Sequence, residues 1–302
     1  MKSTSSRTSP KSIFSIQLRK MKISLFWKGK EQTYDVNDKT RADFLFAEAA
    51  KFSRLKQNRV RIIYESNQKR IPIQPSQIIS QLPSTKFVIR DLGPQFSYKG
   101  VFILEYLGPL LIWPIMKFFV PTTPNKYLTF SSMMWTLHYI KRIFETLVIH
   151  SFSHPTMPLF NLFKNCTYYW GFAALIAYFV ETNSLNVNNT SQLQNYIVPF
   201  FFVCEGLNLY CHCKLRLLRP KGSLGHFLPK GFLFDSITCP NYTMEILAWT
   251  CFAIYVQVWP AYLFPICGAA QMYVWADKKR KNLISEFPEA RKRGRITPFT
   301  FL

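Results

Sequence analysis

The residues of this chain best suited to chemistry are charged groups embedded in apolar sequence. Four carboxylates fall inside apolar stretches, namely Glu105, Glu145, Glu205 and Glu245. Two cations, Lys141 and Arg142, lie four and three residues before Glu145. Charged groups inside a membrane span are energetically unfavourable, so they are functional candidates by default. The same spacing also fits a structural ion pair on one helix face, in which Glu145 neutralises Lys141 or Arg142. The sequence leaves both interpretations open.

The segment from Glu205 to Glu245 concentrates polar residues that suit an anionic nucleotide. The residues at helical spacing in its first part are Glu205, Gly206, Asn208, His212, Arg216 and Arg219. A loop rich in Pro and Gly then carries His226, and the sequence CPNYTME from Cys239 to Glu245 opens the next helix. Arg binds phosphate bidentately, and Asn or Glu holds an amide or a ribose. No GxGxxG or P-loop pattern occurs in the sequence, so we expect any nucleotide to bind outside the usual α/β folds.

The seven cysteines point neither to a disulfide framework nor to a metal site. All of them lie in or beside the apolar portion of the chain, which is not the pattern of a secreted disulfide-rich domain. A zinc site built from Cys211, His212 and Cys213, with His226 and Cys239 beyond, is the alternative. Its spacing fits no standard ligand pattern, and cysteines near membrane spans usually pack as small apolar residues. The sequence therefore predicts no metal.

The charge distribution excludes a single soluble globule. The net charge is +22, but residues 101–276 hold only 10 basic and 6 acidic groups, whereas residues 1–100 hold 20 and 7 and residues 277–302 hold 8 and 3. A basic head and a basic tail thus flank an apolar middle. Nucleic-acid binding usually needs a basic face on a folded domain, whereas Lys and Arg beside apolar spans mark the cytosolic side of a membrane. We therefore expect a membrane protein and no nucleic-acid partner.

The first part of the chain reads as a small mixed domain. Residues 1–20 are rich in Ser, Lys and Arg and are predicted to be a disordered tail. Strands are expected at Met21–Trp27, Gln32–Val36, Asn58–Tyr64 and Lys86–Arg90, with an amphipathic helix at Thr40–Leu55. This order resembles the ubiquitin-like β-grasp, and we place that domain at residues 21–92. The fold by itself assigns no activity.

The remainder, residues 93–302, is expected to be a membrane-embedded helical domain. Six apolar stretches approach the length that crosses a bilayer, near 99–120, 131–150, 159–180, 193–211, 243–257 and 259–275. The loop 181–192 has no Lys or Arg and carries sequons at Asn188 and Asn189, whereas the loop 212–240 is basic. Six spans place every strongly basic segment and both termini in the cytosol. The fold class is therefore mainly α, with six spans (about 6–7) after the β-grasp head.

Several motifs in the same order resemble the trans-2-enoyl-CoA reductases of the steroid 5α-reductase superfamily. They are DLGPQ at Asp91–Gln95, EYLGPL at Glu105–Leu110, HYIKR at His138–Arg142, ETL at Glu145–Leu147, YYWGF at Tyr168–Phe172 and CPNY at Cys239–Tyr242. The likeness runs from about Met21 to Leu302. It implies a multi-pass enzyme of the endoplasmic reticulum membrane that reduces a long-chain trans-2-enoyl-CoA with NADPH, the last step of very-long-chain fatty acid elongation. The implied partners are this substrate, membrane lipid and other elongase subunits.

The resemblance also implies roles for individual residues. Tyr242 matches the proton donor, and a phenol suits that role where cations stabilise the phenolate that it leaves. The other positions matched to activity are Gln95, Glu105, Lys141 and Arg142. Lys141 and Arg142 are expected either to bind phosphates of CoA or NADPH or to form ion pairs with Glu105 and Glu145. The expected cofactor-binding residues are Asn208, His212, Arg216, Arg219, His226, Asn241, Glu245, Lys279 and Arg280, with Lys279 and Arg280 near the adenosine 2′-phosphate. The chain has Arg280 and Leu283 where relatives tend to have His and Tyr.

Two other functions remain open from the sequence. A steroid or polyprenol reductase would keep the fold and change the substrate, although the β-grasp head and the motif Asp91–Gln95 look specific to the enoyl-CoA branch. A non-catalytic membrane adaptor would use the head to bind elongase subunits. The joint retention of Tyr242, Asn241 and Glu245 with Lys141 and Arg142 favours an enzyme.

Overall fold

The computed structural model describes residues 20–66, 68–152, 155–183, 192–218 and 227–297. The expected N-terminal tail, the sequons, Arg219 and His226 lie outside the described residues. The chain divides into two compact units, Met1–Gln95 and Phe96–Leu302, each with its own core. Mainly helical structure with an N-terminal sheet region, as predicted, is confirmed.

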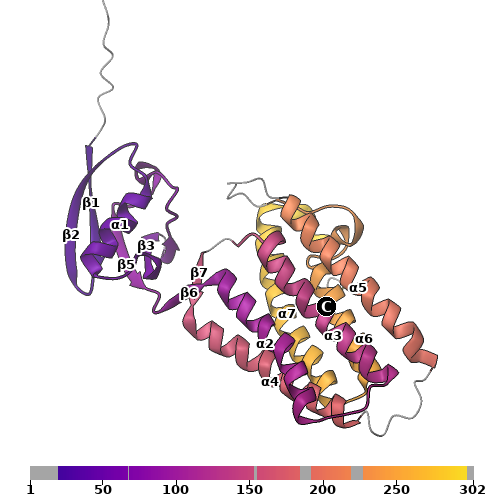
Figure 1. Ribbon diagram of the computed structural model, residues 1–302. Helices are drawn as coiled ribbons and strands as arrows, with labels where there is room; N and C mark the ends of the chain where they lie inside the picture. The colour runs from indigo at the N-terminus through magenta and orange to yellow at the C-terminus, as the bar shows by residue number, and fades with distance from the viewer. Residues whose placement is uncertain (1–19, 67, 153–154, 184–191, 219–226, 298–302) are drawn as a thin grey trace, which may run out of the picture. The chain divides into compact units, whose positions relative to one another are not determined.

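The first unit is a five-stranded sheet with one α-helix (Figure 1). Its elements are β1 (Lys20–Trp27), β2 (Lys30–Asn37), α1 (Ala42–Ser53), β3 (Val60–Ser66), β4 (Lys69–Pro72) and β5 (Lys86–Asp91), with 3-10 turns at Gln57–Arg59 and Ile79–Gln81. The described strands have the order β2-β1-β5-β3-β4, in which β1 and β5 pair in parallel and the other neighbours pair antiparallel. The β1–β2 hairpin turns through Lys28 and Gly29, whose φ angles of 47° and 78° match the strand twist.

The predicted strands and helix of this unit agree with the structure to within two residues at each end. Strand β4 was not predicted, because its four residues, KRIP, are all exposed and show no apolar alternation. The core of the unit forms where the inward residues of the sheet, such as Leu25, Ile62 and Phe87, meet Leu45 and Ala49 of α1.

The second unit is a bundle of six long helices (Figure 1). They are α2 (Tyr98–Phe119), α3 (Lys126–Phe144), α4 (Leu159–Asn183), α5 (Gln192–Leu217), α6 (Pro240–Val256) and α7 (Trp259–Glu286). A π-helical turn, Glu145–Ile149, continues α3, and 3-10 turns occur at Phe232–Asp235 and Pro288–Lys292. The short strands β6 (Gln95–Ser97) and β7 (Thr156–Pro158) pair with each other. Each of the six predicted apolar stretches coincides with one of these helices.

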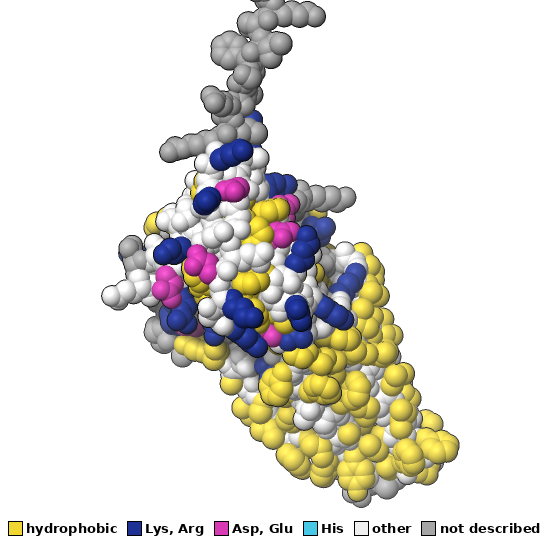
Figure 2. Space-filling model, turned by 90° about the vertical axis from the view of Figure 1, so that its left-hand side faces the viewer, with side chains coloured by type: hydrophobic (Ala, Val, Ile, Leu, Met, Phe, Trp, Pro, Cys, Tyr) yellow, Lys and Arg dark blue, Asp and Glu magenta, His cyan; other side chains and the backbone are white. Residues whose placement is uncertain are grey.

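Two of the described helices, α2 and α5, are long and apolar enough to cross a membrane. The bundle also exposes many large hydrophobic side chains, and these cover much of its visible surface in Figure 2. Phe118 is 82% exposed and Phe160 is 73% exposed, for example. Soluble proteins rarely expose apolar surface on this scale, so the outer face of the bundle suits an apolar environment.

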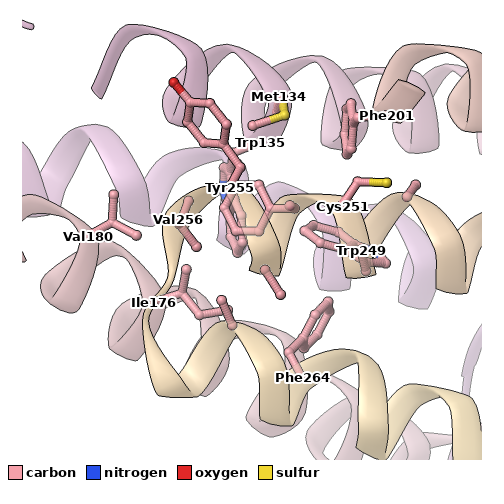
Figure 3. Close-up of a cluster of buried hydrophobic side chains, with 14 of the residues drawn as sticks. Met134, Trp135, Ile176, Val180, Phe201, Trp249, Cys251, Tyr255, Val256 and Phe264 are labelled. Atoms are coloured by element: carbon pink, nitrogen blue, oxygen red, sulfur yellow. The ribbon is translucent and has the colours of Figure 1, made fainter. Parts of the chain in front are cut away.

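Inside the bundle, aromatic side chains join the helices (Figure 3). The ring centre of Trp249 on α6 lies 5.5 Å from the ring centre of Trp135 on α3 and 4.8 Å from that of Phe264 on α7. Both pairs have edge-to-face geometry. Edge-to-face pairs contribute stability beyond the area that they bury. This packing fixes α6 between α3 and α7, and α6 begins with the segment that carries Asn241, Tyr242 and Glu245.

Gly108 allows α2 and α4 to approach closely, and we expect Gly108→Ala to destabilise the bundle. A Cβ atom at this position would overlap the indole of Trp170, whose Nε1 donates to the Leu104 carbonyl at 3.1 Å. Overpacking of this kind costs about 1–3 kcal/mol, so the detergent-solubilised variant should melt at a lower temperature. Gly171→Ala is the matched control, because a Cβ there meets nothing within 4 Å. Equal melting of Gly108→Ala and wild type would show that the indole moves without penalty.

Candidate active site

Helical spacing directs a set of polar side chains to one buried site in the bundle. We call this set the charged cluster. Its members are His138, Lys141, Arg142 and Glu145 from α3 and its π turn, Glu205, Asn208 and His212 from α5, and Asn241 and Glu245 from α6. Within each helix the spacings of three, four or seven residues keep the side chains on one face. Eight members are buried or nearly so, and Lys141 is only 13% exposed at its side chain.

Glu205 forms the first centre of the cluster. Its Oε1 lies 2.8 Å from His138 Nδ1, and its Oε2 lies 2.7 Å from Lys141 Nζ. The same ammonium donates to Asn208 Oδ1 at 2.6 Å. A buried ion pair needs further hydrogen bonds to offset desolvation, and this centre has them. Glu205 therefore fixes Lys141 across the α3–α5 interface.

Glu145 forms the second centre. Its Oε2 accepts from Arg142 Nη1 at 2.5 Å and lies 3.1 Å from His212 Nδ1, while Oε1 lies 3.5 Å from Lys141 Nζ. Arg142 also donates from Nη2 to the Tyr106 hydroxyl of α2 at 2.8 Å. Glu145 is the first residue of the π turn, and such turns are frequent at functional sites.

Ion pairing, one of the two roles considered for Lys141 and Arg142, is thus present in the structure. The expected partner Glu145 contacts both cations, but the second partner differs, since Lys141 contacts Glu205 and Arg142 lies near Glu245 where Glu105 was expected. Glu105 instead accepts a hydrogen bond from Asn165 of α4 at 2.8 Å. The difference arises because Glu205 is distant in sequence and only helix packing brings it to Lys141.

Amide side chains connect α5 to α6 on the other side of the cluster. Asn208 Nδ2 donates to the Asn241 carbonyl at 2.8 Å and to Glu245 Oε2 at 3.3 Å. Asn241 Nδ2 lies 3.3 Å from His212 Nε2. Four of the expected cofactor-binding residues, Asn208, His212, Asn241 and Glu245, are therefore brought together.

Tyr242 follows Asn241 but faces α7. Its hydroxyl accepts a hydrogen bond from Lys279 Nζ at 2.8 Å, and the same ammonium lies 4.6 Å from the centre of its ring. Trp275 packs nearby, with ring centres 6.4 Å apart. The Lys279 ammonium therefore places a positive charge against the phenol oxygen and ring. Of the expected residues, Tyr242 and Lys279 thus form a second, smaller pair beside the cluster.

Three further expected residues that the structure describes, Gln95, Arg216 and Arg280, are not part of the cluster. Gln95 belongs to the first unit, where its side-chain amide donates to the carbonyls of Leu92 and Gly93. Arg216 is half-buried, about one turn beyond His212 on α5. The guanidinium of Arg280 donates to the backbone carbonyls of Arg293 and Arg291.

Three potential metal ligands also meet in this region. One ligand atom each from Glu145, His150 and His212 lies within 4.8 Å of the others. However, Arg142 already donates to Oε2 of the same carboxylate, so a divalent cation would lie beside a fixed positive charge. We therefore interpret the group as part of the charged network. The alternative zinc set around Cys211 includes His226, outside the described residues.

Sequence reasoning did not assign site roles to His138, Tyr106, Asn165 or His150. His138 had a usable signal, because it precedes Glu145 by seven residues and so shares its helix face. The other three carry no such signal: Tyr106 contacts Arg142 from α2, Asn165 of α4 contacts Glu105, and His150 follows the π turn.

Comparison with known proteins supports the motif resemblance. A family described as 3-oxo-5-alpha-steroid 4-dehydrogenase matches residues 155–301. The "Very-long-chain enoyl-CoA reductase" of Dictyostelium discoideum is 38% identical over 83% of this chain and 88% of its own length. The "Probable very-long-chain enoyl-CoA reductase art-1" of Caenorhabditis elegans is 40% identical over 82% of this chain and 88% of its own length. The chain therefore belongs to the very-long-chain enoyl-CoA reductase family, within the wider group of steroid 5α-reductase-like proteins.

Proposed function

We propose that this protein reduces trans-2-enoyl-CoA to saturated acyl-CoA with NADPH, as the final step of very-long-chain fatty acid elongation. The observation that carries the proposal is the pairing of Tyr242 with Lys279 directly beside the charged cluster. Family membership supplies the reaction class, since the similar proteins are named for enoyl-CoA reduction.

In this proposal Tyr242 gives its proton to the α-carbon of the substrate. Lys279 stabilises the phenolate that remains, because its ammonium both donates to the oxygen and lies over the ring. NADPH, when bound, supplies the hydride for the β-carbon. Negative charge develops on the thioester oxygen during the reaction, and nearby donors lower the barrier. Lys141 and Arg142 are the cluster's cationic donors for this purpose, and the roles expected for Gln95 and Glu105 stay predictions.

The composition of the cluster suits the nicotinamide end of the cofactor better than its phosphates. Three carboxylates face two obligate cations there, so the cluster has no positive excess to attract phosphate. Among the described atoms, Arg142 Nε has no hydrogen-bond partner, and Glu245 Oε1 lies 3.8 Å from it. A carboxamide carries both a hydrogen-bond donor and an acceptor, so it suits a cluster that contains both carboxylates and cations. Asn208, His212, Asn241 and Glu245 would hold this end. Lys279 lies at the reacting end with Tyr242, so Arg216, with Arg219 and His226 outside the described residues, is the candidate for the phosphate-bearing end.

We further propose that helices α2–α7 span the endoplasmic reticulum membrane with both termini in the cytosol. The exposed hydrophobic surface of the bundle and the basic flanks of the chain support this placement. The first unit is proposed to be a ubiquitin-like β-grasp, supported by its strand order and its parallel β1–β5 pair. The proposed partners of the protein are membrane lipid and other elongase subunits.

The proposal is tested by following NADPH oxidation by the detergent-purified protein with trans-2-hexadecenoyl-CoA. We expect turnover that saturates with both substrates and is faster with NADPH than with NADH. A second candidate, steroid reduction, is favoured by the description of the matched family, so a 3-oxo-4-ene steroid is assayed in parallel. Turnover of the steroid alone would replace the proposed substrate class, and turnover of neither compound would reject both.

A further inference from the structure

The segment after α7 forms a strap, Pro288–Ile296, that packs against the start of α6. Gly294 N donates to the Ser236 carbonyl at 2.9 Å, and the Gly294 carbonyl accepts from Thr238 N at 2.9 Å. One residue further, the Arg295 carbonyl accepts from Cys239 N at 3.1 Å. The strap therefore pairs with the residues before α6 as a short parallel strand would.

This pairing holds the backbone on both sides of Tyr242. Before Tyr242, the Cys239 carbonyl accepts from the amides of Tyr242 and Thr243 at 3.0 and 3.4 Å, so Cys239 starts the helix. After Tyr242, the Thr243 hydroxyl donates to the carbonyl of Ile296 in the strap at 2.5 Å. Moving the strap would therefore move the peptide that carries the Tyr242 side chain.

Two side chains on one face of α7 hold the strap in turn. The guanidinium of Arg280 donates from Nε to the Arg293 carbonyl at 2.5 Å and from Nη2 to the Arg291 carbonyl at 2.6 Å. Asp277, three residues earlier, accepts from Arg295 Nε at 2.7 Å. Lys279 of the same helix contacts the Tyr242 hydroxyl. Helix α7 thus fixes Tyr242 twice, at its hydroxyl directly and at its backbone through the strap.

We propose that Arg280 is a positioning residue, which sets the place of Tyr242 by anchoring the strap. This inference rests on the proposed function of Tyr242. It differs from the phosphate contact expected from the sequence, because the planar guanidinium already bridges two backbone carbonyls in the strap. An ammonium cannot reproduce that two-pronged geometry, so Lys is a poor replacement here.

The test compares Arg280→Gln and Arg280→Lys with wild type in steady-state kinetics and in amide hydrogen exchange. A displacement of a catalytic group by about 1 Å can lower the rate a hundredfold, so we expect kcat to fall by about tenfold or more in both variants. The KM for NADPH and the preference for NADPH over NADH should stay within about twofold of wild type. The amides of Thr238 and Cys239 should exchange at least about tenfold faster, because their strap acceptors are released.

The opposite pattern would overturn the proposal. If Arg280 binds the 2′-phosphate, its loss raises the KM for NADPH, leaves that for NADH unchanged and does not alter exchange at Thr238 and Cys239. Lys278→Gln is the matched control, since Lys278 is exposed on the same helix two residues before Arg280. It should behave as wild type in every readout.

A milder variant keeps the test decisive if Arg280→Gln does not fold. Thr243→Val preserves side-chain shape and removes the hydroxyl, which donates to the Ile296 carbonyl and makes a longer contact of 3.5 Å with the Cys239 carbonyl. We expect a lower kcat, an unchanged KM for NADPH and faster exchange in the strap, whereas wild-type kcat would count against positioning by the strap. The exchange readout does not depend on turnover, so it decides whether Arg280 anchors the strap even if the wild-type protein reduces no enoyl-CoA.

Discussion

Tyr242→Phe should lower the turnover of trans-2-hexadecenoyl-CoA by about 10²–10⁴-fold, the range expected for loss of a general acid. The substitution removes only the hydroxyl that accepts from Lys279 Nζ, and the aromatic ring can still pack beside Trp275. Protein folding and NADPH binding should therefore be retained. The measurements are NADPH oxidation for the rate, and nicotinamide fluorescence for cofactor binding.

Tyr196→Phe is the control for this experiment. Tyr196 is 76% exposed near the start of α5, whereas the charged cluster uses the later residues of that helix. Its loss should leave both rate and binding unchanged. Wild-type turnover by Tyr242→Phe would remove this tyrosine from the mechanism and direct attention to the donors of the charged cluster.

The second large effect is expected on stability, from Glu145→Ala. Glu145 is fully buried and contacts Arg142, Lys141 and His212. Removing one partner of a buried ion pair leaves the other charge uncompensated and costs about 3–5 kcal/mol. For a unit of this size we expect the melting temperature in detergent to fall by about 10 °C, measured by tryptophan fluorescence.

An exposed pair provides the comparison. Glu65→Ala breaks the contact between Glu65 and Arg70, whose side chains are about two-thirds exposed, and pairs of that kind contribute about 1 kcal/mol or less. The double variant with Arg142→Met and Glu145→Leu should melt above Glu145→Ala, because it removes both charges together. If Glu145→Ala melted like wild type, Arg142 would have to be neutralised by Glu245, which already lies 3.8 Å from its Nε.

Local sequence patterns predicted the elements that carry the site. Apolar stretches located all six helices, and spacings of three and four residues placed Lys141, Arg142 and Glu145 on one face of α3. The ends of the helices were less predictable. The apolar stretch ends near 275, but helix α7 continues to Glu286. Its last turns consist mainly of polar residues, so hydrophobicity alone did not predict them as helix. That extension is what carries Lys279 to Tyr242 and Arg280 to the strap.

What the sequence determined by itself was therefore most of the candidate residues, their distribution over helices and the family resemblance, since each depends on local order along the chain. Only the tertiary structure decided which groups these residues contact. Lys141 meets Glu205 rather than Glu105, Tyr242 meets Lys279, and Arg280 holds the strap instead of standing free for a phosphate. These contacts join residues far apart in sequence, and they depend on how each helix is rotated and packed against its neighbours. The apolar pattern of a single helix specifies which face is buried but not which polar group lies opposite.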